Sequence, residues 1–189
     1  MHTELILGGQ KSGKSRRAEL LARGWLAASP AHRAVLVATA RYGDEEMRAR
    51  IARHQAERAA RVPGLLSVEE PLRLAEAIAR ESRPGTLVVV DCLTLWLTNL
   101  LMPLQEYEQN RPPALDLPAQ TAMLLEAIRQ APGPLALVSN EIGLGVIPMG
   151  RDVRGFVDAL GRLNQDVAAA CARVTLMAAG LPLALKDAA

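Results

Sequence analysis

The residues whose types and spacing indicate chemistry lie near the start of the chain. Gly8 to Ser15 reads G-x-x-x-x-G-K-S, the pattern of a phosphate-binding loop. Glycines let the backbone curl so that successive N–H groups point at an anion, and a helix that begins at the end of the loop directs its positive end at the same phosphates. The pattern predicts that Lys14 reaches the β- and γ-phosphates of a nucleotide and that Ser15 binds Mg²⁺.

The segments around this loop fit the same interpretation. A short apolar strand, Leu5 to Leu7, precedes it, and apolar residues recur at helical spacing after it. The alternative is a glycine-rich turn without a ligand. We expect eight residues to surround the phosphates: Gly8, Gly9, Gln10, Lys11, Ser12, Gly13, Lys14 and Ser15.

Two further strands are predicted to end beside the nucleotide. Thr86 to Val90 is continuously apolar and β-branched, as expected of a strand buried on both faces, and it runs into Asp91. We expect Asp91 to orient Mg²⁺ or its bound water. The strand 34–38 leads into Thr39, Ala40 and Arg41, at the end where open α/β sheets place ligands.

A charged helix is predicted from Asp44 to about Ala60, with acidic residues in its first turn that suit the helix dipole. His54 lies on this helix among several arginines. On the residues alone, the helix is either a solvated surface or a basic surface near nucleotide phosphates. A connection at 67–71 is expected to lead into a helix with Leu72, Ala75, Ile78 and Ala79 facing inward. Further helices are expected at 92–102, 119–130 and 151–172, and further strands at 135–139, 174–178 and 182–185. The segments 103–118 and 142–150 are expected to be loops, the second of them containing glycines.

This alternation of strands and helices predicts one α/β domain over residues 1–189, with a mostly parallel sheet and helices on both faces. The chain carries 22 basic and 20 acidic residues and only 3% aromatic residues, which argues against nucleic-acid binding. The apolar region 87–104 is interrupted by polar residues and a proline, so no membrane span is expected. With no signal peptide and no metal or redox spacing of Cys92 and Cys171, a soluble cytoplasmic protein is expected.

A phosphate-binding loop leaves three classes open: a small-molecule kinase or nucleotidyltransferase, a regulatory GTPase, and a motor or nucleic-acid ATPase. No asparagine is followed by lysine, so the N-K-x-D guanine reader of a switch GTPase is missing. Size and charge favour the first class.

Several longer pieces carry a resemblance over nearly the full length: GGQKSGKS (8–15), DEEMRARIARHQAER (44–58), VVVDCLTLWLTNLL (88–101), SNEIGLGVIP (139–148), GRLNQDVAAA (161–170) and AGLPLALK (179–186). In these pieces the chain resembles the adenosylcobinamide kinase/adenosylcobinamide-phosphate guanylyltransferase family of cobalamin biosynthesis. The resemblance implies phosphorylation of the aminopropanol hydroxyl of adenosylcobinamide by ATP or GTP. It also implies transfer of GMP from GTP to that phosphate through a guanylylated histidine.

The resemblance also implies roles for particular residues. His54 is the only histidine in the matching helix and would be the nucleophile, although Arg53-His54 stands where some members carry two histidines. Glu69 or Glu70 would hold the guanine, the alternative being an acidic residue at the start of a helix. A symmetric oligomer, a trimer, is expected. Asn140 and Glu141 would position the corrinoid hydroxyl or a metal-bound water. The alternatives are a kinase of another small alcohol without a covalent intermediate and a nucleotide-binding regulator.

Overall fold

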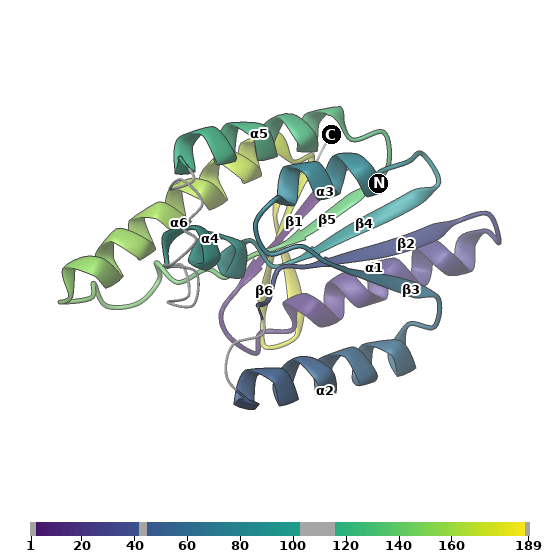
Figure 1. Ribbon diagram of the computed structural model, residues 1–189, viewed down its shortest axis with the longest axis horizontal. Coiled ribbons are helices and arrows are strands. Elements are labelled where there is room, and N and C mark those ends of the chain that lie inside the picture. Colours follow the sequence, from purple (N-terminus) through teal and green to yellow (C-terminus); the bar gives the residue numbers. More distant parts are fainter. Residues whose placement is uncertain (1–2, 42–44, 103–115, 188–189) are drawn as a thin grey trace, which may run out of the picture.

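The computed structural model describes residues 3–41, 45–102 and 116–187 (Figure 1). Seven strands form one sheet in the order β3-β2-β4-β5-β1-β6-β7. All pairings are parallel except the one between β6 and β7. The strands are β1 (Thr3–Gly8), β2 (Arg33–Ala38), β3 (Leu65–Glu69), β4 (Thr86–Asp91), β5 (Leu135–Val138), β6 (Arg173–Ala178) and β7 (Leu181–Lys186).

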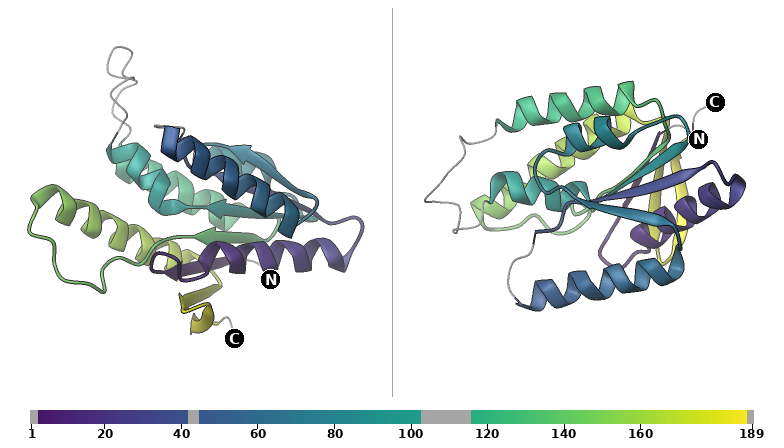
Figure 2. Two further views of the ribbon diagram at one scale, coloured as in Figure 1. Left: turned by 90° about the horizontal axis from the view of Figure 1, so that it is seen from below. Right: turned by 45° about the vertical axis from the view of Figure 1, so that its right-hand side comes forward.

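Helices cover both faces of this sheet, as the alternating pattern predicted (Figures 1 and 2). On one face α1 (Lys14–Ala28) packs against the strands, and α2 (Glu45–Arg61) lies beside it. On the other face lie α3 (Leu74–Glu81), α4 (Leu93–Leu101), α5 (Leu117–Gln130) and α6 (Arg151–Ala170). The two layers of helices bury the central strands on both sides, which explains their continuous apolar sequences.

The core is accordingly divided by the sheet. The larger apolar cluster joins α3, α4, α5 and α6 to the sheet around Trp96, whose indole N–H donates to the carbonyl of Leu72 at 2.8 Å. The smaller cluster joins Ala18 and Ala22 of α1 to the opposite sides of the strands. Small residues on α1 allow the helix to pack close to the sheet. This packing fixes the position of α1 relative to β1, and with it the two ends of the loop that joins them.

One predicted connection is wrong. The segment 67–71 was expected to be irregular, but Leu65–Glu69 is strand β3, which pairs in parallel with β2 at the edge of the sheet. Its sequence is short and half polar because β3 has a neighbour on one side only and most of its residues are exposed. The apolar signal that marks buried strands is therefore missing from it.

Helix boundaries and faces differ in smaller ways. In α3 the buried residues are Leu74, Ala75, Ala77 and Ile78. The inward position predicted for Ala79 is wrong because this residue is exposed, and Leu72 lies before the helix and is half-buried. The helix begins at Leu74, which shifts the buried stripe. In α6 the predicted inward residue Val153 is 54% exposed, because the first turns of this helix extend past the edge of the sheet (Figure 1). Helix α5 begins at Leu117, within the predicted loop, most of which lies outside the described residues.

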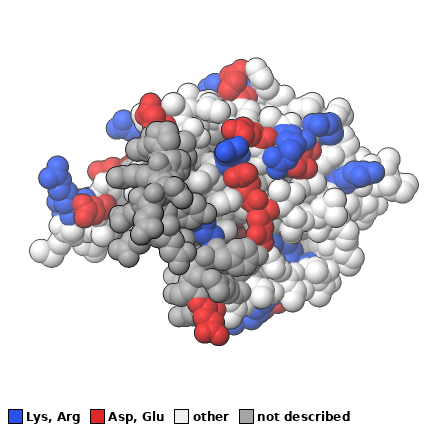
Figure 3. Space-filling model, in the orientation of Figure 1, with Lys and Arg blue, Asp and Glu red and all other residues white. Residues whose placement is uncertain are grey.

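The charged side chains on one face of the molecule are of both signs, and basic and acidic groups are interspersed there (Figure 3). Within the described part of the chain, no helix combines the length and the apolar character that crossing a membrane requires.

Candidate nucleotide site

The loop between β1 and α1 is built by close backbone approaches. Gly8 has a φ of +151°, and a Cβ on it would lie 2.5 Å from both the Ser12 hydroxyl oxygen and the Met177 carbonyl oxygen. Gly13 has a φ of +101° and immediately precedes α1. No other residue type fits these two positions without strain, so the glycines of the sequence pattern are explained by geometry.

Two polar groups inside this loop are suited to an anion. The Ser12 hydroxyl is buried and has no hydrogen-bond partner among the described residues. Lys14 is 8% exposed, and its ammonium donates to the carbonyl of Gly9 at 2.5 Å. Burial lowers the pKa of Lys14 from its ordinary value, while the nearby Cys92 and Asp91 oppose this shift. A phosphate would supply the missing partner of Ser12 and the counter-charge for Lys14.

Asp91 lies at the end of β4, and it has charged neighbours on both sides. Its carboxylate lies 3.8 Å from the Arg58 guanidinium of α2 and also interacts electrostatically with Lys14. Among the described residues there is no group of three or more His, Cys, Asp or Glu side chains that would hold a metal alone. Mg²⁺ that arrives with a nucleotide needs only one or two protein ligands. The hydroxyl of Ser15 in the first turn of α1 and the Asp91 carboxylate are of the right chemical type.

The residues after β2 are held to the end of β4. The Thr39 hydroxyl donates to the Cys92 carbonyl at 2.7 Å and accepts from the Cys92 N–H at 2.9 Å, and the side chain is fully buried. The Asn99 amide of α4 donates to the Thr39 carbonyl at 2.7 Å. Thr39 therefore links the end of β2 to the residues after β4 and to α4. Ala40 and Arg41 follow it at the carboxyl edge of the sheet, and both are partly exposed.

The acidic pair after β3 is divided between two environments. The Glu70 carboxylate accepts from the backbone N–H groups of Leu72 and Arg73, at 3.2 and 2.9 Å, ahead of α3. The Glu69 carboxylate accepts from the Gln55 amide of α2 at 3.2 Å. Glu70 thus has a clear structural role at the start of a helix, whereas Glu69 lies between the sheet edge and α2.

The end of β5 lies between the ends of β1 and β4 and carries Asn140 and Glu141. Their backbone is fixed from both sides: the Glu141 N–H donates to the Gly8 carbonyl at 3.0 Å, and the Asn140 N–H donates to the Thr94 hydroxyl at 2.8 Å. Asn164 of α6 donates to the Asn140 carbonyl at 3.0 Å. Asn164 is thus buried on an apolar helix face and supports Asn140 through its amide nitrogen, while its side-chain oxygen has no hydrogen-bond partner among the described residues.

The position of His54 is described only at the level of the backbone. The residue belongs to α2, but its side chain lies outside the described part of the structure. Arg58, one helical turn later, reaches both Asp91 and Glu19 at 3.8 Å, and Arg61 pairs with Glu19 at 2.8 Å. The sequence reasoning missed Arg58 and Glu19. Their signal was weak, because one arginine of many on a charged helix looks like surface.

The first strand of this mostly parallel sheet runs into a glycine-containing loop and a helix, and a carboxylate lies at the end of β4, two strands away. Together with the sequence pattern of the loop, this arrangement is that of a P-loop nucleotide-binding enzyme. The model of the family described as cobinamide kinase/cobinamide phosphate guanyltransferase matches residues 4–185. The chain belongs to this family, as the resemblance predicted.

Named relatives match over nearly their whole lengths. The chain is 47% identical to the bifunctional adenosylcobalamin biosynthesis protein CobP of Pseudomonas aeruginosa, over 97% of this chain and 96% of that protein. It is 34% identical to the bifunctional adenosylcobalamin biosynthesis protein CobU of Escherichia coli, over 96% of this chain and 98% of that protein. Among solved structures, the flagellar accessory protein FlaH of Methanocaldococcus jannaschii is similar in fold, with a TM-score of 0.53 at 12% identity, over 98% of this chain and 78% of that one.

Proposed function

We propose that the protein phosphorylates the aminopropanol hydroxyl of adenosylcobinamide with ATP or GTP and then transfers GMP from GTP to the new phosphate. Family membership over the whole chain supports the pair of reactions. The observation that carries the nucleotide chemistry is the loop 8–15, in which the buried Ser12 hydroxyl lacks a hydrogen-bond partner among the described residues and the buried Lys14 has no carboxylate within the loop. Such a loop is stabilised by a bound phosphate.

In the first reaction, we assign the phosphates to the backbone of residues 8–15 together with the side chains of Ser12 and Lys14. Ser15 and Asp91 would hold Mg²⁺, which neutralises charge on the transferred phosphoryl group. The hydroxyl oxygen of the corrinoid attacks the γ-phosphorus, and the nucleoside diphosphate leaves. We place this hydroxyl near Asn140 and Glu141, which lie between the loop and Asp91 because β5 lies between β1 and β4.

In the second reaction, we assign the nucleophile to His54. A neutral imidazole nitrogen attacks the α-phosphorus of GTP, and pyrophosphate leaves. A phosphate oxygen of the corrinoid then attacks the same phosphorus, which releases the histidine and forms adenosylcobinamide-GDP. Two contacts support this assignment, because they hold α2 against the carboxyl ends of β3 and β4: Gln55 contacts Glu69, and Arg58 lies near Asp91. A third contact, between Arg61 and Glu19, holds α2 to α1.

The base and sugar of the nucleotide are assigned to the ends of β2 and β3. We propose that Thr39, Ala40 and Arg41 border them through the backbone, since the Thr39 hydroxyl is engaged with Cys92. Of the two acidic candidates, we assign the guanine N1–H and amino group to Glu69, because its carboxylate accepts an exposed hydrogen bond from a side-chain amide of α2, whereas the Glu70 carboxylate accepts two backbone N–H groups at the start of α3. We also propose a cytoplasmic homo-oligomer, a trimer by its resemblance to the family.

The covalent step gives the sharpest test. The protein is incubated with GTP labelled on the α-phosphate, and the adduct is detected by intact mass as a GMP increment that is labile to acid and stable to base. The parent and His32→Gln are expected to become labelled, because His32 stacks on Trp25 and lies outside the site. His54→Ala is expected to lose the label and retain phosphorylation of adenosylcobinamide.

Lys14→Ala is expected to lose both reactions, because the phosphates lose their main side-chain cation. A label that persists in His54→Ala would remove this residue from the mechanism. If no variant and no parent protein carries GMP while the corrinoid is still phosphorylated, a kinase without a covalent intermediate replaces the proposal.

A further inference from the structure

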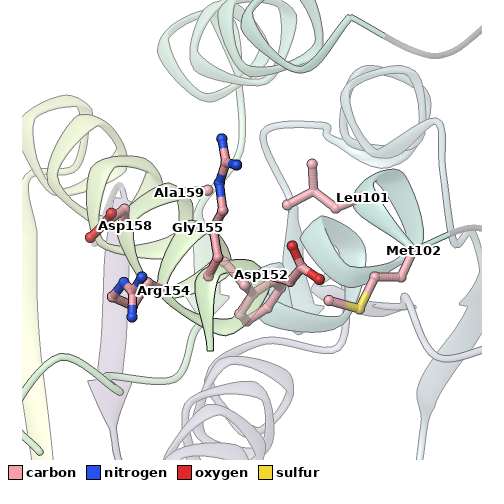
Figure 4. A pocket seen from close by; sticks show the side chains of 9 residues that line it. Leu101, Met102, Asp152, Arg154, Gly155, Asp158 and Ala159 are labelled. Atoms are coloured by element: carbon pink, nitrogen blue, oxygen red, sulfur yellow. The ribbon is translucent and has the colours of Figure 1, made fainter. Parts of the chain in front are cut away.

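A cavity of about 750 Å³ lies between the end of α4 and the first turns of α6, apart from the nucleotide loop (Figure 4). Leu101 at the end of α4 and the following residue Met102 line one side, and Asp152, Gly155 and Phe156 line the other side from α6. Figure 4 shows Asp152 on the side of α6 that faces Met102. Leu101 and Met102 are 41% and 52% exposed, although most apolar residues earlier in α4 are buried. The cavity therefore combines uncovered apolar surface with charged groups at its border.

Both helices that line this cavity also reach the proposed reaction site, each by a part that lies away from the cavity. Helix α4 starts two residues after Asp91, and its nine residues span about 13 Å at 1.5 Å each. Helix α6 follows the loop that begins at Asn140, and its buried part is tied to that residue by Asn164. An elongated substrate whose reacting end lies at Asn140 would therefore place its other end in the cavity.

The corrinoid substrate has such a shape. Its reacting hydroxyl is carried on an amide-linked aminopropanol arm about as long as two extended residues, roughly 7 Å. The arm is about half as long as α4, so the macrocycle attached to it would lie beside the second half of that helix. The macrocycle itself has apolar faces and a border of carboxamide groups, each with both hydrogen-bond donors and an acceptor.

The chemistry of the lining matches that border. Leu101, Met102 and Phe156 offer apolar surface to the face of a ring, while Asp152 accepts from amide N–H groups and Arg151 donates to amide carbonyls. Resting on the proposed function, we propose that this cavity between α4 and α6 binds the corrin macrocycle of adenosylcobinamide. The macrocycle is thereby held a helix length away from the phosphates, and only its arm enters the nucleotide site.

Two glycines of α6 provide a matched test. A Cβ on Gly155 or on Gly161 would meet no atom within 4 Å outside the helix backbone, but only Gly155 lines the cavity. Gly155→Leu is therefore expected to fill the cavity without disturbing the fold, and Gly161→Leu is the control. Adenosylcobinamide binding is measured by equilibrium dialysis in the absence of nucleotide, followed by the absorbance of the corrinoid.

Gly155→Leu is expected to weaken this binding by about tenfold or more, equivalent to ~1.4 kcal/mol, and Gly161→Leu to leave it unchanged. Protein labelling by α-labelled GTP needs no corrinoid and is expected to be normal in both variants, which also shows that they fold. Met102→Glu, at the opposite wall, is expected to reproduce the loss if Gly155→Leu folds poorly.

Equal affinity in Gly155→Leu, Met102→Glu and the parent would overturn the assignment of the cavity while leaving the two reactions intact. A change of oligomeric mass in Gly155→Leu with unchanged corrinoid affinity would also overturn it, because a second copy of the chain would then cover this surface. A parent protein that binds GTP but never phosphorylates adenosylcobinamide would instead reject the proposed function.

Discussion

At the scale of single residues, the strand ends carry two kinds of polar group. Thr39, Asn99 and Asn164 satisfy backbone groups and hold neighbouring segments together. The buried Ser12 hydroxyl has no hydrogen-bond partner among the described residues, and the buried Lys14 ammonium has no carboxylate within its loop. The G-x-x-x-x-G-K-S pattern alone placed Ser12 and Lys14 in a phosphate-binding loop, because the spacing of this pattern follows from the way a backbone loop surrounds a phosphate. No sequence pattern predicted the contacts of Thr39, Asn99 and Asn164, since their hydrogen-bond partners lie between 24 and 60 residues away in the chain.

The two cysteines give a prediction with a defined pH range. Burial raises the pKa of Cys92 to about 11 and that of Cys171 to about 12, against 9.0 for an unperturbed thiol. The folded protein thus keeps protons that the unfolded chain loses. Their contribution to the free energy of unfolding is complete below pH 9 and is lost as the pH rises through these values.

We therefore expect the native protein to react with iodoacetamide at pH 8.5 far more slowly than the urea-unfolded protein. Unfolding curves between pH 8 and 10.5 should show a steeper loss of stability in the parent than in a Cys92→Ala, Cys171→Ala variant. Native thiols that react as fast as unfolded ones would show that they are not buried in solution.

At the scale of elements, α2 differs from the other helices in how it is attached. Glu19 of α1 is buried and accepts from Arg61 at 2.8 and 3.1 Å, and Arg58 lies between Glu19 and Asp91. The described side chains of α2 thus reach the body of the protein through charged and polar groups. Sequence patterns identified the helix from its dipole and length. Sequence patterns could not identify the ion pairs that attach α2, because a sequence does not distinguish an exposed arginine from one that forms an ion pair.

This attachment predicts a local effect of changing Glu19. Glu19→Gln keeps the shape of the side chain and removes the charge that holds two arginines, so α2 is expected to open more often. Hydrogen–deuterium exchange followed by mass spectrometry should show faster exchange of backbone amides in 49–61, by about fivefold or more for a loss of ~1 kcal/mol.

The amides of α3, on the opposite face of the sheet, should exchange as in the parent. Glu57→Gln is a suitable control, because this exposed residue pairs with Arg61 only within α2. Equal exchange of α2 in Glu19→Gln and in the control would mean that apolar packing, and not the buried carboxylate, holds this helix.

At the scale of the whole molecule, the sheet order brings distant segments to one edge. The sequence predicted a mostly parallel sheet from the alternation of segments, and the structure confirms it. The order of the strands did not follow from that pattern, because alternation restricts the connections without fixing which strands are neighbours. Edge strand β3 was missed for a related reason, since a strand with one neighbour lacks the apolar run of a central strand.

One long-range contact supports a prediction at this scale. The turn between β6 and β7 lies against the phosphate-binding loop: the Gly180 N–H donates to the Ser12 carbonyl at 3.0 Å, and a Cβ on Gly13 would lie 3.2 Å from the Gly180 Cα. Gly180 has a φ of +81°, which β-branched residues rarely adopt. Gly180→Val is therefore expected to lower the free energy of unfolding by about 1–3 kcal/mol and to weaken GTP binding.

Isothermal titration calorimetry with GTP, combined with urea unfolding, checks this expectation. Gly145→Val is the control, because Gly145 has open space around it and lacks a positive φ. If Gly180→Val binds GTP as the parent does, the turn does not support the loop.

The place of β1 in the sheet also affects how the protein is made. β1 comes first among the described strands, yet both of its neighbours in the sheet come much later in the sequence, β5 at residues 135–138 and β6 at residues 173–178. During translation the loop 8–15 therefore emerges before its two flanking strands and lacks both of them until residues 135–138 and 173–178 have been synthesised. Cellular GTP is thus expected to stabilise the finished enzyme and to give little protection to the nascent chain.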